Sequence, residues 1–414
     1  MPIKGIINLP GDKSISHRAL LFASLSNKKC IINNISTGQD VETTRKCLEQ
    51  LGIVSTVKDS TIEIKGGTFK ESKFPLNCEN SGTTIRLLVG LLAGQGLAAK
   101  FTGDSSLSKR PMDRIIKPLH NMGLSIKSND GYLPLVISSN ELKGIDYILP
   151  ISSAQIKSCI ILAALGSKGE TKIVEKNQSR DHTEIMLKEL GGTIKYDDMI
   201  YVHPLNNFLN PFNITIPGDP SSAAFFAAAA ALIPNSDITI KNLLANPTRI
   251  GFFEIIKSMG AGVEWLNMHQ ELGEWVGDVH VYFKPLSGFH IKENLVPSII
   301  DEIPIIAILA TQADSPTIIE GASELRVKES DRIHAICKNL TFMGAEVIEK
   351  KDGFIINPGN MLHNAKIETF SDHRIAMAFS IAGLLTGKKN ILDNKECVDI
   401  SFPGFFTMLN GIIQ

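Results

Sequence analysis

Apolar residues fill nearly every position in six stretches of the chain, a pattern typical of helices that are buried on all sides. The stretches are PGDKSISHRALLFASL, ENSGTTIRLLVGLLAG, ISSAQIKSCIILAAL, PGDPSSAAFFAAAAAL, VPSIIDEIPIIAILA and FSDHRIAMAFSIAGLL. Each carries Ser, Asp, Asn or Pro near its start, and these residues cap or begin helices. The pattern therefore predicts six buried helices.

A second feature recurs between these stretches. An amphipathic segment is followed by a glycine and then a strand-like run, at intervals of 68 to 84 residues, with the glycine at Gly52, Gly123, Gly191, Gly260 and Gly344. Glycine readily adopts the left-handed conformation that ends a helix. The β-branched runs TIEIKG, LPLVIS, MIYVHP, VHVYF and GFIINP predict strands that pair through tight turns.

Together the two features predict a repeated unit of strand, buried helix, strand, outer helix and hairpin. A chain of 414 residues exceeds what one hydrophobic core usually serves, so two domains are expected. Three units per domain would bury three apolar helices behind sheets. We expect two α/β lobes whose buried helices begin at a common cleft.

Composition narrows the possible partners. Lysine and arginine total 42 against 43 acidic residues, so no net field favours a nucleic acid or an anionic membrane. The six cysteines have no CxxC or zinc-like spacing, which predicts reduced and mostly buried thiols. The N-terminus lacks a leader pattern, and the longest apolar run, 223–233, is shorter than the ~20 residues of a membrane span. We expect a soluble, cytoplasmic and monomeric protein.

Polar residues gather at the starts of the predicted buried helices, where free amides and the helix dipole favour anions. They are Lys13, Ser14, Arg18, Asn80, Gly82, Arg86, Ser153, Gln155, Lys157, Asp301, Glu302, Asp372, His373 and Arg374. Any one of them could simply be a cap or a solvated charge. The cations, however, lie in apolar segments, where an unpaired charge would cost several kcal/mol. They need anionic partners.

Two further stretches are rich in cations. SKRPMDR contains Lys109, Arg110 and Arg114, and ELRVKESDRI contains Lys328, Glu329 and Arg332. Helical spacing would place Lys328 and Arg332 on one face. The alternative is an exposed helix with surface ion pairs.

Several kinds of chemistry are not supported by the sequence. GDKS lacks the GxxxxGK[ST] pattern of a phosphate loop, which argues against a nucleotide hydrolase. No His, Cys and carboxylate residues have metal-ligand spacing, and no Ser or Cys lies in a recognisable nucleophile motif. We expect neither a metal nor another cofactor.

The motifs PGDKSISHRAL, NSGTTIRLL, SKRPMDR, SSAQIKS, SRDHTEIM, IDEIP, RVKESDRI and SDHRIAM occur in order from Pro10 to Met377. In these motifs the chain resembles the EPSP synthase family. GDKSISHR and RVKESDR resemble the branch associated with glyphosate tolerance. The resemblance implies an inside-out α/β barrel fold of six βαβαββ repeats in two lobes. One lobe would be 12–219, mainly with shikimate 3-phosphate contacts, and the other 1–11 with 220–414, with the acid/base and phosphoenolpyruvate contacts.

The resemblance also implies substrates and site residues. Catalysis would use Lys13, Asp301 and Glu329. Shikimate 3-phosphate would contact Lys13, Ser14, Arg18, Ser153, Gln155, Arg180, Asp301 and Lys328. Phosphoenolpyruvate would contact Lys13, Gly82, Arg110, Gln155, Lys328, Arg332 and Arg374. Two phosphates and two carboxylates need many fixed cations, so this inventory suits the chemistry.

In this family the 5-hydroxyl of shikimate 3-phosphate adds to C2 of phosphoenolpyruvate while C3 is protonated, and phosphate then leaves. Asp301 would take the hydroxyl proton, and Glu329 or Lys13 would protonate C3. Two positions depart from the usual pattern: Glu324 stands where many relatives have Asn, and Ile400 where many have Lys.

Two alternatives remain open at this point. The sister transferase acting on UDP-N-acetylglucosamine shares the fold but usually carries a reactive Cys in the loop matching residues 102–112, where this chain has none. A non-catalytic phosphometabolite-binding protein would keep the cations but lose the acid and base. The presence of Asp301 and Glu329 argues against it.

Overall fold

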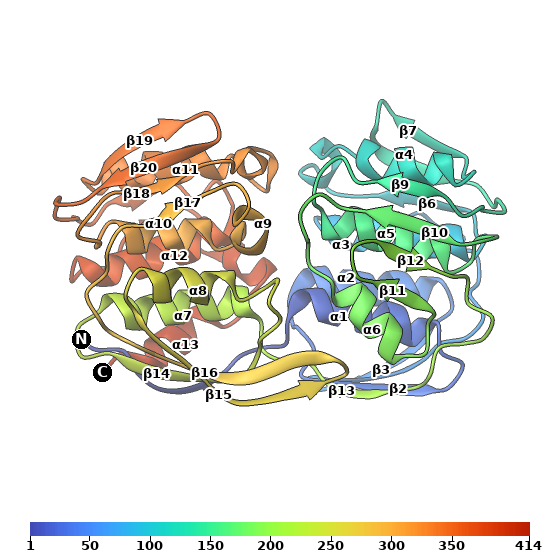
Figure 1. Ribbon diagram of the computed structural model, residues 1–414, viewed down its shortest axis with the longest axis horizontal. Coiled ribbons are helices and arrows are strands. Elements are labelled where there is room, and N and C mark those ends of the chain that lie inside the picture. The colour runs from blue at the N-terminus through green and yellow to red at the C-terminus, as the bar shows by residue number, and fades with distance from the viewer. The chain divides into compact units, whose positions relative to one another are not determined.

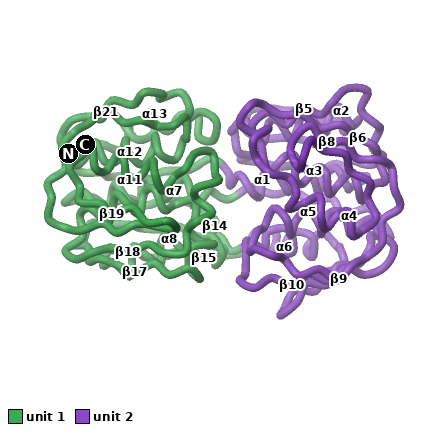
Figure 2. The backbone as a smooth tube through the Cα atoms, turned by 90° about the horizontal axis from the view of Figure 1, so that it is seen from above, with its two compact units in different colours: residues 1–10, 217–270, 275–414 green, residues 11–216, 271–274 purple.

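The computed structural model describes residues 1–414 and divides into two compact units (Figure 2). Unit 1 comprises residues 1–10, 217–270 and 275–414, and unit 2 comprises residues 11–216 with 271–274. These boundaries differ slightly from the division after residues 11 and 219 that the sequence suggested. Residues 271–274, which that division assigned to the lobe formed by 1–11 and 220–414, pack with unit 2.

Unit 2 contains three βαβαββ copies (Figure 1). Its apolar helices are α1 (Lys13–Ser24), α3 (Gly82–Gly94) and α5 (Ala154–Ala164), and its outer helices are α2 (Gln39–Gln50), α4 (Asp113–Asn121) and α6 (His182–Glu189). Three four-stranded sheets cover them. Their strands, in sheet order, are β13 (Asn213–Thr215), β2 (Lys29–Asn33), β4 (Thr61–Lys65) and β3 (Val54–Lys58); β5 (Leu76–Asn77), β6 (Ala99–Thr102), β8 (Tyr132–Ile137) and β7 (Ile126–Asn129); and β11 (Ile194–Tyr196), β12 (Ile200–Val202), β10 (Thr171–Val174) and β9 (Asp146–Ile148).

Unit 1 repeats this plan with the apolar helices α7 (Pro220–Leu232), α10 (Ile303–Ala310) and α12 (His373–Leu385). Its other helices are α8 (Gly251–Ser258), α9 (Val296–Ile299), α11 (Arg332–Phe342) and α13 (Phe405–Ile412). Its sheets, in strand order, are β1 (Lys4–Asn8), β14 (Asp237–Leu244), β16 (Glu274–Tyr282) and β15 (Gly262–Glu271); β17 (His290–Ile291), β18 (Thr317–Ile319), β20 (Gly353–Asn357) and β19 (Glu346–Lys350); and the pair β21 (Lys366–Ile367) and β22 (Ile391–Leu392). The sixth copy ends at α13 without a hairpin.

The strands β1 and β13 each pair with a strand far away in the sequence. β1 begins the chain but pairs in parallel with β14 of unit 1, whereas β13 pairs in parallel with β2 of unit 2. The chain therefore passes from one unit to the other after each of these strands. This pairing accounts for the presence of residues 1–10 in the same unit as the chain from residue 217 onward.

The predicted helix ends are confirmed by the backbone. All five marker glycines have φ between +87° and +109°, and each follows the C-cap residue of an outer helix. The left-handed conformation closes those helices as expected from the repeat.

The apolar helices form the interior, as their composition requires, and the sheets lie outside them (Figure 1). In unit 2, α3 and α5 approach each other closely at Gly90, where an added Cβ would lie 2.2 Å from the Cys159 carbonyl oxygen. In unit 1, α7, α10 and α12 pack together around one apolar core. The expected α/β fold with its helices inside is confirmed.

Two other expectations can be compared with the structure. All six cysteines are free and buried, as predicted. None of the helices combines the length and the apolarity that a membrane crossing requires.

Candidate active site

The amino end of α1 carries the first predicted site residue, Lys13. Asp12 caps this helix by accepting from the Ile15 amide over 2.8 Å. One residue inside the cap, Lys13 Nζ lies 2.8 Å from Asp40 Oδ2, and the Lys13 side chain keeps a quarter of its surface exposed. The ion pair fixes an accessible ammonium group at the end of a helix.

Arg18, one turn further into α1, is buried and held at each guanidinium nitrogen. Nε donates to Thr183 Oγ1 over 2.6 Å, Nη2 to Ser158 Oγ over 2.7 Å, and Nη1 to the Ser14 carbonyl oxygen over 2.9 Å. Burial lowers the pKa of Arg18 to about 10, against the opposing effect of Glu184. The group therefore stays charged near neutral pH and has one orientation.

The starts of α3 and α5 meet through a second set of polar contacts. Arg86 Nη1 donates to Gln155 Oε1 over 2.8 Å, and Gln155 Nε2 donates to Thr83 Oγ1 over 3.0 Å. Gly82 begins α3 beside them, and a Cβ at that position would lie 2.5 Å from Arg86 Nη1 and 3.5 Å from Arg110 Nη1. The absence of a side chain at Gly82 leaves room for two guanidinium groups.

Arg110 reaches the same end of α3 from the loop that follows β6. Its Nη2 donates to Asn80 Oδ1 over 2.7 Å, just ahead of the Ser81 cap. Unit 2 therefore brings together the predicted residues Gly82, Arg110 and Gln155. Ser153 directly precedes α5 but makes no side-chain cap hydrogen bond, and Arg180 lies two residues before α6.

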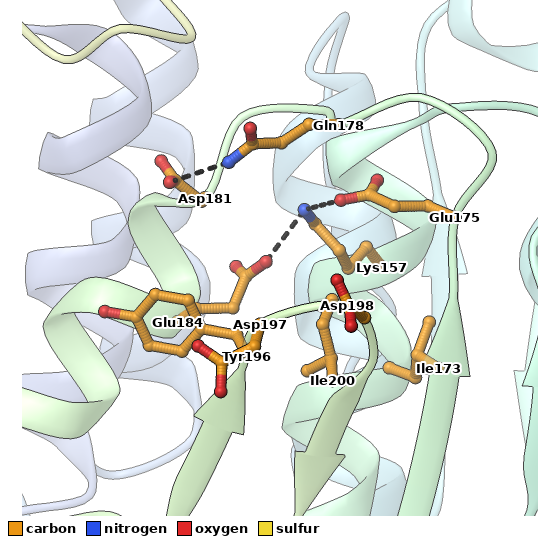
Figure 3. A pocket seen from close by; sticks show the side chains of 10 residues that line it. All are labelled: Lys157, Ile173, Glu175, Gln178, Asp181, Glu184, Tyr196, Asp197, Asp198 and Ile200. Carbon is orange, nitrogen blue, oxygen red and sulfur yellow. Dashed lines mark hydrogen bonds and ion pairs between the residues drawn. The ribbon is translucent and has the colours of Figure 1, made fainter.

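A small cavity of about 170 Å³ in unit 2 is lined by residues of α5, α6, β10, β11 and β12 (Figure 3). Lys157 Nζ reaches it from α5 and lies 2.7 Å from both Glu175 Oε1 and Glu184 Oε1. Burial alone would lower the pKa of Lys157, but Glu184 and Glu175 raise it above its ordinary value. The anionic partners that this lysine needs are thus provided by the protein itself.

In unit 1 the predicted residues gather around Arg332, the first residue of α11. Arg332 Nε donates to Asp372 Oδ2 over 2.8 Å, and Nη2 donates to Glu329 Oε2 over 2.7 Å. Its side chain is 1% exposed. Burial alone would lower the pKa of Arg332, but Asp372, Glu329 and Asp301 raise it above its ordinary value.

Asp301 lies in the turn between α9 and α10, which break the single helix expected in this part of the sequence. Its Oδ1 is 3.4 Å from Arg332 Nη1 and 3.7 Å from Arg374 Nε, and its side chain is 18% exposed. Arg374 Nη1 also donates to the Asp301 carbonyl oxygen over 3.2 Å. A reachable carboxylate thus lies against two guanidinium groups, beside Glu329 on the same arginine.

The expected shared helix face of Lys328 and Arg332 is wrong. Lys328 follows the 3-10 helix Ser323–Val327, whereas Arg332 begins α11 after its cap, Asp331. The polar segment between them ends one helix and caps the next. Helical spacing therefore does not apply.

Two carboxylates and one hydroxyl bind predicted site residues, and the sequence did not identify them as partners. Asp40 pairs with Lys13, Asp372 pairs with Arg332 and caps α12, and Thr183 holds Arg18. Asp372 was visible as a helix start. The other two contacts join residues 27 and 165 positions apart, and no local pattern marks them.

The arrangement defines a class of protein. Apolar helices inside small sheets, with cations and carboxylates at the helix starts, are the architecture of the enolpyruvyl transferase fold. An enolpyruvyl transferase from Streptomyces tendae matches this structure with a TM-score of 0.76 over 99% of this chain and 95% of its own, at 15% identity, which supports the fold alone.

The family is shown by closer matches. The profile of EPSP synthase (3-phosphoshikimate 1-carboxyvinyltransferase) matches residues 1–409. Proteins named 3-phosphoshikimate 1-carboxyvinyltransferase from Thermodesulfovibrio yellowstonii and Endomicrobium trichonymphae are 45% and 44% identical, covering 98% and 100% of this chain and 96% and 98% of their own lengths. EPSP synthase from Acinetobacter baumannii is 39% identical, with a TM-score of 0.89 over 99% of this chain and 96% of its own. The chain belongs to the EPSP synthase family.

Proposed function

We propose that this protein transfers the enolpyruvyl group of phosphoenolpyruvate to the 5-hydroxyl of shikimate 3-phosphate, giving 5-enolpyruvylshikimate 3-phosphate and phosphate. The observation that carries the proposal is the position of Asp301, 3.4 Å from Arg332 and 3.7 Å from Arg374. These two cations offset the repulsion between the carboxylate, which acts as the base, and an anionic substrate. The family membership supports these two substrates.

In the first step the substrate oxygen forms a bond to C2 of phosphoenolpyruvate and C3 receives a proton. Asp301 accepts the proton of the hydroxyl, and Glu329 or Lys13 donates the proton to C3. In the second step the bond from C2 to the phosphate oxygen breaks and a proton leaves C3, which restores the double bond. No cofactor is needed for this balance of atoms and electrons.

We assign the substrate contacts as the sequence suggested. Shikimate 3-phosphate uses Lys13, Ser14, Arg18, Ser153, Gln155, Arg180, Asp301 and Lys328. Phosphoenolpyruvate uses Lys13, Gly82, Arg110, Gln155, Lys328, Arg332 and Arg374. The contacts of Arg18 and Arg110 support this assignment, because hydrogen bonds from Arg18 to Thr183 and Ser158, and from Arg110 to Asn80, hold each guanidinium in one orientation.

Three finer points belong to the same proposal. The motifs GDKSISHR and RVKESDR favour the glyphosate-tolerance-associated branch of the family. The balanced net charge of −1 favours no nucleic-acid partner. We also propose a monomer in the cytoplasm.

The test is phosphate release from phosphoenolpyruvate with the purified protein. Release that requires shikimate 3-phosphate supports the proposal. The same assay with UDP-N-acetylglucosamine in its place distinguishes the sister reaction. Binding of both ligands without phosphate release would identify a non-catalytic binding protein and overturn the proposal.

A further inference from the structure

The hairpin of β15 and β16 has a tip, residues 271–274, that packs with unit 2 although its strands belong to unit 1. At this tip Glu274 Oε1 lies 2.7 Å from His182 Nδ1, and the two side chains are 1% and 0% exposed. His182 is the first residue of α6. A buried carboxylate from a distant hairpin thus contacts the start of the helix that follows Arg180.

The turn itself is shaped to fit against α6. Gly273 has φ +79°, and a Cβ there would lie 2.8 Å from Glu189 Cγ and 2.9 Å from Ile185 Cγ2. A side chain at this position would strain the backbone and collide with the helix. The tip therefore packs against α6 at Gly273 as well as at Glu274.

The start of α6 also holds Arg18. Thr183, next to His182, accepts from Arg18 Nε over 2.6 Å, and Thr183 Oγ1 lies 2.6 Å from Ser158 Oγ, the acceptor for Arg18 Nη2. A shift of α6 by a few tenths of an ångström would weaken the bond from Arg18 Nε to Thr183 and the bond between Thr183 and Ser158 on α5. The position of α6 therefore contributes to the orientation of Arg18, together with Ser14 and Ser158.

The charge of Glu274 also acts on Arg18. The pKa of Arg18 is lowered to about 10, mainly by burial and to a smaller extent by Arg180, whereas Glu184, Asp12 and Glu274 act in the opposite direction. Two guanidinium groups that lie close together repel each other, and nearby anions help both of them to stay charged. Glu274 and Glu184 provide such anions on the protein side.

We propose that Glu274 is a positioning residue for the substrate phosphate. Through His182 it fixes the start of α6, so that Thr183 orients Arg18 and Arg180 lies ready for the phosphate of shikimate 3-phosphate. The inference rests on the proposed function, because it names the residue that arranges part of that site. Glu274 contacts no substrate itself.

The test compares Glu274→Gln with the unchanged protein in steady-state kinetics. The amide keeps the shape of the side chain but removes its charge, so we expect the KM for shikimate 3-phosphate to rise about 10-fold, as for loss of a charge-assisted contact. The KM for phosphoenolpyruvate should change less than about twofold, because none of its proposed contacts lies on α6 or next to it in the sequence. Glu271→Gln is the matched control. The Glu271 carboxylate lies at the same tip, but its hydrogen bond is from the Thr215 amide, over 3.2 Å, and not from α6.

A role in stability alone would look different. If Glu274→Gln lowers the melting temperature and raises both KM values equally, or leaves the KM for shikimate 3-phosphate unchanged, the inference is overturned. If the unchanged protein shows no turnover, the proposed function falls and the inference with it. The two failures are therefore distinguishable.

A second pair of variants covers the case in which Glu274→Gln does not fold. Thr183→Val keeps the volume but removes the hydroxyl that accepts from Arg18, and Thr183→Ser retains it. We expect the same selective rise in the KM for shikimate 3-phosphate with valine and recovery to within about threefold with serine. Equal behaviour of the two variants would overturn the inference.

Discussion

Arg332 Nε and Asp372 Oδ2 lie 2.8 Å apart, and both side chains are almost completely shielded from water. The arginine that we assign to phosphoenolpyruvate is thus already paired with a carboxylate of the protein. Asp372 also accepts from the Arg374 amide and so caps α12. One side chain fixes two of the proposed phosphoenolpyruvate residues.

Asp372→Asn should therefore destabilise the protein. The amide can still cap the helix, but it leaves a buried guanidinium short of its main counter-charge, which costs about 3 kcal/mol. Denaturant unfolding measures the loss. Asp331→Asn is the control, because Asp331 also caps a helix but is 40% exposed, and its replacement should change the free energy of unfolding by less than about 1 kcal/mol.

The same pair predicts a dependence of stability on pH. Burial alone would raise the pKa of Asp372, but Arg332 holds it below the ordinary value of 3.8. A depressed pKa in the folded state stabilises the fold above pH 3.8, and this contribution is lost as the pH falls through the folded-state value. The unfolding free energy of Asp372→Asn should fall less steeply below pH 4 than that of the unchanged protein. Parallel curves would contradict the ion pair.

Asp301→Asn should lower kcat by about 100-fold or more, since a general base contributes at least that much. The amide keeps the shape of the side chain, so shikimate 3-phosphate should still bind. Steady-state kinetics and calorimetry measure the two effects. A near-normal kcat would show that another group takes the hydroxyl proton.

Arg110→Ala should weaken phosphoenolpyruvate far more than shikimate 3-phosphate, by about 2 kcal/mol, because a charge-assisted contact to one ligand is lost. Arg110 is a cleaner choice than Arg374, whose contacts with Asp301 would also change. Lys109→Ala removes a neighbouring but exposed cation and should leave both affinities unchanged. Calorimetry that finds equal losses for both ligands would show that the pockets are assigned wrongly.

Gly82→Ala should raise the inhibition constant of glyphosate more than the KM for phosphoenolpyruvate. The new methyl group would lie 2.5 Å from Arg86 Nη1, so that guanidinium must move, and overpacking of this kind costs about 1–3 kcal/mol. Glyphosate is longer than phosphoenolpyruvate and should meet the displaced group first. The unchanged protein, which keeps the glycine, should be inhibited competitively with phosphoenolpyruvate.

Inhibition kinetics of the two proteins side by side check this prediction. Gly411→Ala serves as the control, because an added Cβ at Gly411, in α13, meets no atom within 4 Å. Equal proportional changes in the inhibition constant and the KM would mean that Gly82 does not border the inhibitor.

The sequence by itself determined the repeated unit. Gly52 and its four counterparts end helices in the left-handed conformation, and the apolar stretches are buried helices, because both properties depend on local backbone preference and on the composition of a segment. The helix starts that carry Lys13, Gly82 and Arg374 could be located for the same reason. The ligands proposed for them came from the family resemblance and not from the local pattern.

Only the tertiary structure decided which side chains meet. Two of the three partners of Arg18 lie 140 and 165 residues away, and Glu274 reaches His182 across 92 residues, so no periodicity in the sequence relates these pairs. The exchange of β1 and β13 between sheets, and the break that places Asp301 in a turn before α10, likewise depend on long-range pairing. Local preference fixes where a helix begins, whereas the packing of distant elements fixes what lies beside it.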